Sequence, residues 1–281
     1  MPKIPENSLN IAFYLYKSYE DAERGVEIGG TGFYVGVPSE KHPRHLYIYG
    51  VSNWHVAIND AASVIRANKT DGTTDIFDYD PSEWDFIPGG GDIAISPILK
   101  IEDAHSVCCI EVKGFATDKI IAEKKINVGD NVFMIGRFVD HDGGKTNLPA
   151  VRFGNISTMP TQMPESNISK GESYCIDMHS RTGYSGSPVF VYRTLGDDLT
   201  KSPLDFSSFM YLLGIHWGQF PEIWKDGKGN DIKGFSGMSM VIPADRILAL
   251  INKPNLRAIR DKNDSEREEY FRKHGYPPIL D

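Results

Sequence analysis

The chain has 281 residues, of which 40% are hydrophobic and 11% aromatic, so it holds enough apolar material for a substantial core. Its formal net charge of -8 disfavours nucleic-acid binding, because the phosphate backbone repels an acidic surface. No apolar stretch approaches the length that a membrane span requires, so we expect no membrane partner.

The cysteines and the first residues indicate in which cellular compartment the protein is expected. The three cysteines, Cys108, Cys109 and Cys175, make a poor disulfide framework because their number is odd and two are adjacent. A reducing compartment suits this composition better. The first residues lack the basic segment and apolar core of a secretion signal. We therefore expect a cytoplasmic protein.

Short apolar, β-branched or aromatic segments recur along the chain between clusters of Gly, Pro, Asn and Asp. This pattern predicts an all-β sandwich or barrel rather than alternating strands and helices. The predicted strands are, in chain order, Ile11–Tyr16, Gly32–Val37, His45–Ser52, Asp92–Ile95, Asn131–Phe138, Pro188–Tyr192, Tyr211–Trp217 and Gly237–Ile242.

Helical periodicity is convincing only near the C-terminus. There Pro243 opens the segment Ala244–Ile251, and proline is well tolerated in the first turn of a helix. The apolar residues on one side of this predicted helix are Ile247, Leu248 and Ile251. From Lys253 the chain becomes dense in charge, and we interpret residues 253–281 as a solvated tail with an exposed helix over Asp264–His274.

A histidine, an aspartate and a serine occur in that order in settings that suit nucleophilic catalysis. His55 ends an apolar strand, Asp92 directly precedes another, and Ser185 lies in a glycine-rich turn. A serine hydroxyl is a weak nucleophile that needs an adjacent base, and a histidine can take its proton. A buried carboxylate then fixes the tautomer of the histidine. Asp80 and Asp85 lie upstream, but neither stands directly before an apolar strand as Asp92 does.

The glycines around the serine have a chemical role of their own. In a tight turn the backbone N–H groups of Gly183 and Ser185 can converge on a developing oxyanion. A side chain at position 183 would crowd the scissile carbonyl. This predicts an oxyanion hole made by Gly183 and Ser185.

Together these segments resemble the chymotrypsin-fold, trypsin-like serine peptidases. The resemblance rests on Val51–Ala57, Gly91–Ile95 and Thr182–Phe190, and it continues in Gly29–Phe33, Gly214–Gly218 and Gly237–Ile251. It implies two packed antiparallel six-stranded β-barrels with a C-terminal helix. It also implies a serine endopeptidase that works through an acyl-enzyme and needs no cofactor and no metal.

The resemblance also suggests how the chain is divided. The predicted first lobe, residues 1–123, carries His55 and Asp92. The predicted second lobe, residues 124–252, carries Ser185, the specificity pocket and the terminal helix, and residues 253–281 form the charged tail.

The sequence Gly214–Gly218 and the residues around the nucleophile are most similar to those of glutamyl endopeptidases of this fold. In that subgroup a strand histidine binds the acidic side chain before the cut, assisted by a hydroxyl residue. The matching residues here are His216 and Ser180, both of which can donate to a carboxylate. Members that cut after basic residues carry an acid where this chain has His179. We therefore expect Glu before the cut, with Gln or Asp as the alternatives.

Two further features concern substrate and regulation. Trp217 and Gly218 are expected to offer a strand edge to an extended protein or peptide substrate. Tyr184 precedes the nucleophile where trypsin-type zymogens carry Asp, so their activating salt bridge is absent. This favours an enzyme that is active as made or is switched by an activating partner protein.

Two alternatives to a constitutive enzyme stay open. The same fold hosts catalytically silent members that bind peptides or act as scaffolds, and an effector peptidase can stay inactive until a partner arrives.

The glycine-rich turns do not point to a phosphate or calcium site. Gly143–Thr146 lacks the first glycine of a phosphate loop, and Asp226–Asp231 lacks the ligands of a calcium loop.

Overall fold

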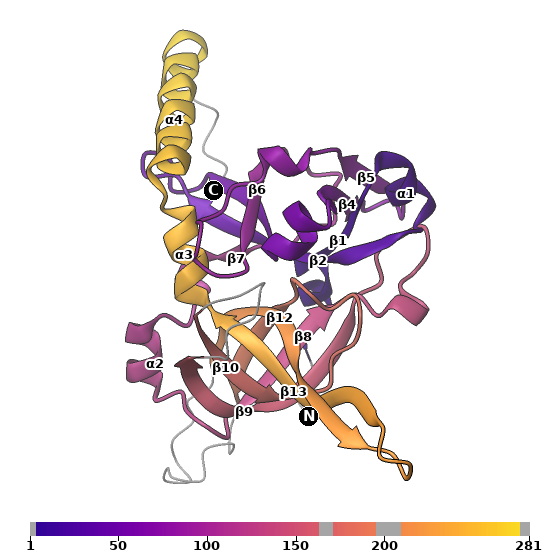
Figure 1. Cartoon of the computed structure of the whole chain (residues 1–281). Coiled ribbons are helices and arrows are strands. Elements are labelled where there is room, and N and C mark those ends of the chain that lie inside the picture. The colour runs from indigo at the N-terminus through magenta and orange to yellow at the C-terminus, as the bar shows by residue number, and fades with distance from the viewer. Residues whose placement is uncertain (1–3, 163–170, 195–208, 276–281) are drawn as a thin grey trace.

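The structure is a computed structural model that describes residues 4–162, 171–194 and 209–275. β-Strands are the main regular structure of the described residues, and they form two lobes, which lie one above the other in Figure 1 with two C-terminal helices along one side. The predicted fold class, all-β and chymotrypsin-like with a C-terminal helix, is confirmed.

The N-terminal lobe is one seven-stranded sheet in the order β5-β4-β1-β2-β3-β6, with β7 parallel to β2. Its strands are β1 (Ala12–Tyr16), β2 (Ile28–Pro38), β3 (Leu46–Ser52), β4 (Val64–Asn68), β5 (Thr74–Phe77), β6 (Ala94–Leu99) and β7 (Ile110–Glu111). The helical segments of this lobe are η1 (Glu6–Ile11), α1 (Tyr19–Arg24), η2 (His55–Asn59), η3 (Pro81–Glu83) and η4 (Val112–Gly114).

This lobe is a half-barrel rather than the closed barrel that the sequence predicted, because β5 and β6 do not pair among the described residues. β5 has only four residues, and each of them is half-buried, so it has no buried face with which to continue the sheet. The segment 78–93 fills the gap instead. It buries Trp84 and reaches β6 through a bridge between Asp85 and Ile95.

The C-terminal lobe is a closed barrel in the order β10-β13-β12-β11-β8-β9. Its strands are β8 (Asn131–Gly136), β9 (Ala150–Gln162), β10 (Glu172–Asp177), β11 (Pro188–Arg193), β12 (Phe209–Lys225) and β13 (Asp231–Pro243), with α2 (Asp118–Lys124) before the barrel and η5 (Val139–His141) after β8. Closure pairs both edges of every strand at the level of the barrel, whereas the ends of β12 and β13 extend beyond it as a hairpin (Figure 1).

One hydrophobic core runs through both lobes and holds them together. It contains Val35 and Tyr49 from the N-terminal sheet together with Phe133 and Ile215 from the barrel. The rings of Phe133 and Phe190 stack with centroids 4.9 Å apart within it. Burial of such side chains is worth about 1.5–3 kcal/mol each, so this shared core fixes the lobes relative to one another.

The first C-terminal helix, α3 (Ala244–Ile251), covers the residues that the sequence predicted. The second, α4 (Pro254–His274), starts ten residues earlier than the predicted exposed helix, at Pro254 instead of Asp264. Its buried residues are Leu256, Arg260 and Asp264, spaced by one turn. No helix in the described part of the chain is both long and apolar enough to cross a membrane.

Polar contacts anchor α4 to the N-terminal sheet. Arg260 donates to the Tyr49 hydroxyl at 3.2 Å. The carboxylate of Asp264 accepts from Ser39 Oγ at 2.7 Å and from the Tyr47 hydroxyl. Burial raises the pKa of Asp264, but the hydrogen bonds from Tyr47 and Ser39 outweigh it and lower the pKa overall. The ionised carboxylate is therefore part of what fixes this helix.

Replacement of Asp264 by alanine is expected to lower the free energy of unfolding by about 1–3 kcal/mol, because the buried Ser39 hydroxyl loses its acceptor and the Tyr47 hydroxyl keeps only the Arg260 carbonyl oxygen at 3.2 Å. Urea unfolding measures this, with Asp261→Ala on the exposed side of α4 as the control. Since the pKa of Asp264 is lowered by folding, its contribution is complete above the unfolded pKa and is lost as pH falls through the folded pKa. Equal stability of the two variants would contradict this account.

Candidate active site

Strand pairing brings the predicted base and its carboxylate together. His55 follows the end of β3, Asp92 precedes β6, and the two strands pair with Ser52 opposite Ala94. Asp92 Oδ2 lies 2.5 Å from His55 Nδ1, and Asp92 Oδ1 accepts from the His55 backbone N–H at 2.8 Å. Asp92 is fully buried. A buried carboxylate at Nδ1 places the imidazole proton there, which leaves Nε2 as the basic nitrogen.

The two upstream acids, Asp80 and Asp85, contact residues other than His55. Asp80 caps η3, accepting from the backbone N–H of Ser82 at 2.8 Å. Asp85 forms an ion pair with Lys253 and accepts a hydrogen bond from Asn255. Among the three acids that the sequence offered, only Asp92 contacts His55.

The loop that carries Ser185 requires glycine at two positions. Gly183 and Gly186 have φ of +95° and +85°, a region that favours glycine. A Cβ atom on Gly186 would lie 1.9 Å from the carbonyl oxygen of Thr31, and one on Gly183 would lie 2.8 Å from Val139 Cγ2. Among the described residues nothing accepts a hydrogen bond from the N–H groups of Gly183 and Ser185, so both are available to an oxyanion.

His55 and Ser185 line the same pocket, which has a volume of about 370 Å³. No hydrogen bond joins Ser185 Oγ to His55 within the described chain, an arrangement common in ligand-free enzymes. The other residues that line the pocket are Gly29, Val56, Asp60, Ser180, Arg181, Thr182, Gly183, His216, Gly218 and Gln219. In the described parts of the sequence no three His, Cys, Asp or Glu side chains converge as metal ligands.

Two residues predicted to bind substrate do not line this pocket. His179 is exposed and lies against Gly237, where a Cβ atom would come within 3.1 Å of its ring. The side chain of Trp217 is buried, and its indole N–H donates to Ser173 Oγ at 3.1 Å. Alternation along the strand turns Trp217 into the core when His216 faces the pocket.

His216 is buried at the base of the pocket. Its Nδ1 lies 3.1 Å from the carbonyl oxygen of Tyr184, and its Nε2 lies 3.0 Å from Ser180 Oγ. Burial is the main cause that lowers the pKa of His216 to about 4, helped by the nearby His55 and opposed by the carbonyl of Tyr184. A carbonyl can only accept, so neutral His216 carries its proton on Nδ1, and Nε2 accepts from the Ser180 hydroxyl.

Gln219 is a pocket residue that the sequence did not reveal. Its amide nitrogen donates to the carbonyl oxygen of Ser180 at 2.6 Å and to Ser180 Oγ at 2.7 Å. In a regular strand, His216 would share its face with residues 218 and 220. The pairing of β12 with β13 shifts between His216 and Gly218, and this bulge turns Gln219 to the pocket.

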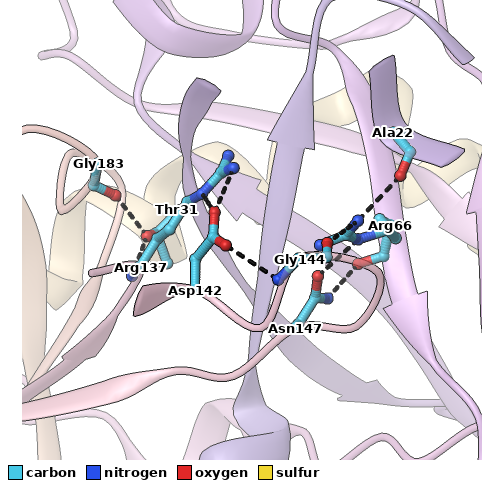
Figure 2. Close-up of polar contacts among 8 residues, drawn as sticks. All are labelled: Ala22, Thr31, Arg66, Arg137, Asp142, Gly144, Asn147 and Gly183. Carbon is cyan, nitrogen blue, oxygen red and sulfur yellow. Dashed lines mark hydrogen bonds and ion pairs between the residues drawn. The ribbon is translucent and has the colours of Figure 1, made fainter. Parts of the chain in front are cut away.

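A polar network joins the lobes (Figure 2). Arg66 of β4 donates to Asn147 Oδ1 at 2.9 Å and to the carbonyl oxygen of Gly144 at 2.8 Å. Arg137, which follows β8, donates to Asp142 at 2.9 and 2.6 Å. Both guanidinium groups lie over the Tyr16 ring, at 4.8 and 4.9 Å from its centroid. The loop after β8 is thereby fixed to the N-terminal lobe.

The fold has counterparts among solved structures. The apo protease domain of MamO from Magnetospirillum magneticum is 14% identical and superposes with a TM-score of 0.53 over 88% of this chain and 99% of that domain. The chain has a chymotrypsin-like fold. An inactive mutant form of Rv3671c from M. tuberculosis H37Rv is 13% identical, with a TM-score of 0.43 over 86% of each chain. No protein-family profile and no curated protein sequence match this chain.

The burial of His216 can be tested through its titration. We expect the imidazole of His216 to titrate near pH 4, because burial lowers its pKa to about 4. Folding thus disfavours its protonation, so its contribution to stability is complete above about pH 6.5, the unfolded value, and is lost as pH falls towards the folded value. An NMR titration measures this, with His216→Gln to assign the signal. A midpoint near the ordinary value of about 6.5 would contradict the burial account.

Proposed function

We propose that this protein is a serine endopeptidase that hydrolyses peptide bonds through an acyl-enzyme. The observation that carries the proposal is one pocket that holds both Ser185 and a His55 whose other ring nitrogen is bonded to buried Asp92. In this mechanism Ser185 Oγ attacks the scissile carbonyl while His55 Nε2 takes the hydroxyl proton. The amides of Gly183 and Ser185 hold the oxyanion, and Asp92 stabilises the imidazolium.

The second half of the reaction uses the same groups. His55 returns its proton to the leaving amine, the C–N bond breaks, and an acyl ester remains on Ser185. Water then attacks the ester with His55 as the base, which releases the acid and restores the hydroxyl.

Strand β12 offers an edge for the substrate. Its pairing with β11 ends at Pro188 and Ile215, whereas its pairing with β13 continues to Lys225. The edge of β12 beyond His216 is therefore open on the β11 side in the described structure. An extended peptide that adds there as an antiparallel strand gains affinity from backbone hydrogen bonds. The pocket binds one of its side chains, which gives specificity.

We propose Glu as the preferred residue before the cut, with Gln or Asp as alternatives. His216 and Ser180 are the polar groups that would meet this side chain, and Arg181 lines the same pocket. In the ligand-free state the Ser180 hydroxyl satisfies His216 Nε2. A carboxylate therefore requires His216 to take up a proton or Ser180 to turn, and a side-chain amide can donate to Nε2 only after Ser180 has turned away.

A catalytically silent peptide-binding protein is the second candidate. The described structure has no hydrogen bond between Ser185 and His55, which fits a silent binder as well as it fits a ligand-free enzyme. A partner that brings the two together would produce a regulated effector protease. Labelling of Ser185 by a fluorophosphonate, alone and with cell extract, distinguishes a constitutive enzyme, a switched enzyme and a silent binder.

Wild-type protein is expected to react with a fluorophosphonate and to cleave peptides, because His55 can activate Ser185. Ser185→Ala is expected to do neither. Asp92→Asn is expected to slow cleavage by roughly ten thousandfold, the loss known for this substitution in a serine protease triad. Asp80→Asn, which alters an exposed helix cap, is the matched control and should keep wild-type activity. Equal rates for the Asp92 and Asp80 variants would refute the assignment of the acid.

The specificity proposal predicts a pH-dependent preference. Below neutral pH a growing fraction of His216 is protonated and can donate to a carboxylate, since its pKa is lowered to about 4. The ratio of kcat/KM for Glu peptides to that for Gln peptides should rise by up to about tenfold for each pH unit lost, until substrate Glu itself protonates at about pH 4.3. Both peptides depend on the same candidate triad, so an effect of pH on the triad cancels in the ratio. His216→Ala should flatten this dependence, and a flat wild-type ratio would overturn the role of His216.

A further inference from the structure

Thr31 is a buried polar residue of β2 that contacts the nucleophile loop from the opposite lobe. Its hydroxyl donates to the carbonyl oxygen of Gly183 at 2.7 Å and accepts from the backbone N–H of Arg137 at 2.9 Å (Figure 2). Its backbone N–H donates to the carbonyl oxygen of Ser185 at 2.9 Å. Thr31 is fully buried, so water does not compete for these contacts.

These contacts hold the loop on both sides of the oxyanion hole. Gly183, with φ of +95°, is a residue of the loop whose backbone can rotate more freely than that of residues with a side chain. One contact fixes the carbonyl of Gly183 and the other fixes the carbonyl of Ser185. Because each peptide group is planar, fixing these carbonyls limits rotation of the segment that presents the two N–H donors.

The hydroxyl of Thr31 is itself held in place. The position between the Gly183 carbonyl and the Arg137 N–H requires a group that donates to the first and accepts from the second. A hydroxyl does both, whereas an aliphatic side chain does neither. Its donor, the N–H of Arg137, belongs to a buried residue whose guanidinium is paired with Asp142. The loop after β8 also borders Gly183 directly, since a Cβ atom there would lie 3.0 Å from the Arg137 carbonyl oxygen.

Loss of the hydroxyl would affect the loop more than the rest of the fold. Without it the Gly183 carbonyl and the Arg137 N–H would both be buried without a partner. Gly183 supplies the most adaptable backbone nearby, so rotation of its peptide groups is the simplest way to regain hydrogen bonds. Such a rotation moves the Gly183 N–H away from the oxyanion position.

We propose that Thr31 is a positioning residue for the oxyanion hole, acting through the carbonyl of Gly183. The proposal rests on the serine endopeptidase function proposed above. It assigns the N-terminal lobe a part in oxyanion stabilisation in addition to supplying His55 and Asp92. Thr31 does not touch the substrate, so its effect is on the rate of the chemical step rather than on substrate binding.

The kinetic test compares Thr31→Ala with Thr31→Ser. The alanine variant should lose roughly ten- to a hundredfold in kcat with little change in KM, less than the loss of an oxyanion donor itself. The serine variant keeps the hydroxyl and should recover to within about threefold of wild type. Ser96→Ala, which removes a buried hydroxyl that bonds to the Gly50 backbone, is the matched control and should stay near wild type.

A second measurement does not depend on catalysis. Hydrogen exchange of residues 181–187 should become faster in Thr31→Ala and stay slow in Thr31→Ser and Ser96→Ala, because the amides of Gly186 and Ser187 lie in the loop that Thr31 holds. Unchanged exchange in Thr31→Ala, or a serine variant as impaired as the alanine variant, would overturn the proposal. If wild-type protein neither cleaves nor labels, the proposed function fails, and the exchange data still decide whether Thr31 holds the loop.

Discussion

The hydrogen bond from the Thr31 N–H to the Ser185 carbonyl, at 2.9 Å, joins the two lobes at the nucleophile. The candidate nucleophile belongs to one lobe and the candidate base to the other, so the chemistry depends on how closely these backbones approach. Glycine permits the approach on both sides. A Cβ atom on Gly30 would lie 2.9 Å from the Ser185 carbonyl oxygen, and one on Gly186 would lie 1.9 Å from the Thr31 carbonyl oxygen. Any side chain at either position would push the lobes apart.

Much of the fold was predictable because its signals are local. Apolar strands flanked by turn residues, and the order of His55, Asp92 and Ser185, can be read without knowing which strands pair. The half-barrel was not predictable, because it depends on whether β5 has a buried face to offer to a neighbour. The early start of α4 was missed for a related reason. Its buried positions include Arg260 and Asp264, and a stripe of charged residues looks like a solvated surface in the sequence.

The residues that line the pocket were likewise only partly predictable from the sequence. His216 and Ser180 were placed in it by resemblance, and they line it. Gln219 joins them only because β12 bulges after His216, and nothing in the sequence indicates that shift of register. Trp217 and His179 do not line the pocket, and the role of Trp217 as part of a strand edge stays a prediction. Motifs thus predicted the candidate residues, whereas backbone irregularity decided which neighbours share the pocket.

The C-terminal tail also bears on Asp92, the candidate triad carboxylate, although it lies far away in sequence. Lys253 pairs with Asp85 and donates to the carbonyl oxygen of Phe86 at 2.9 Å, in the segment that leads to Asp92. Asp85 in turn bonds through its backbone to Ile95 at 2.8 and 2.9 Å, just beyond Asp92. The loop that delivers the carboxylate to His55 is therefore fixed at both ends, by β6 and by the start of α4. Asp85, which the sequence offered as a rival for the catalytic role, instead helps to place the residue that contacts the histidine.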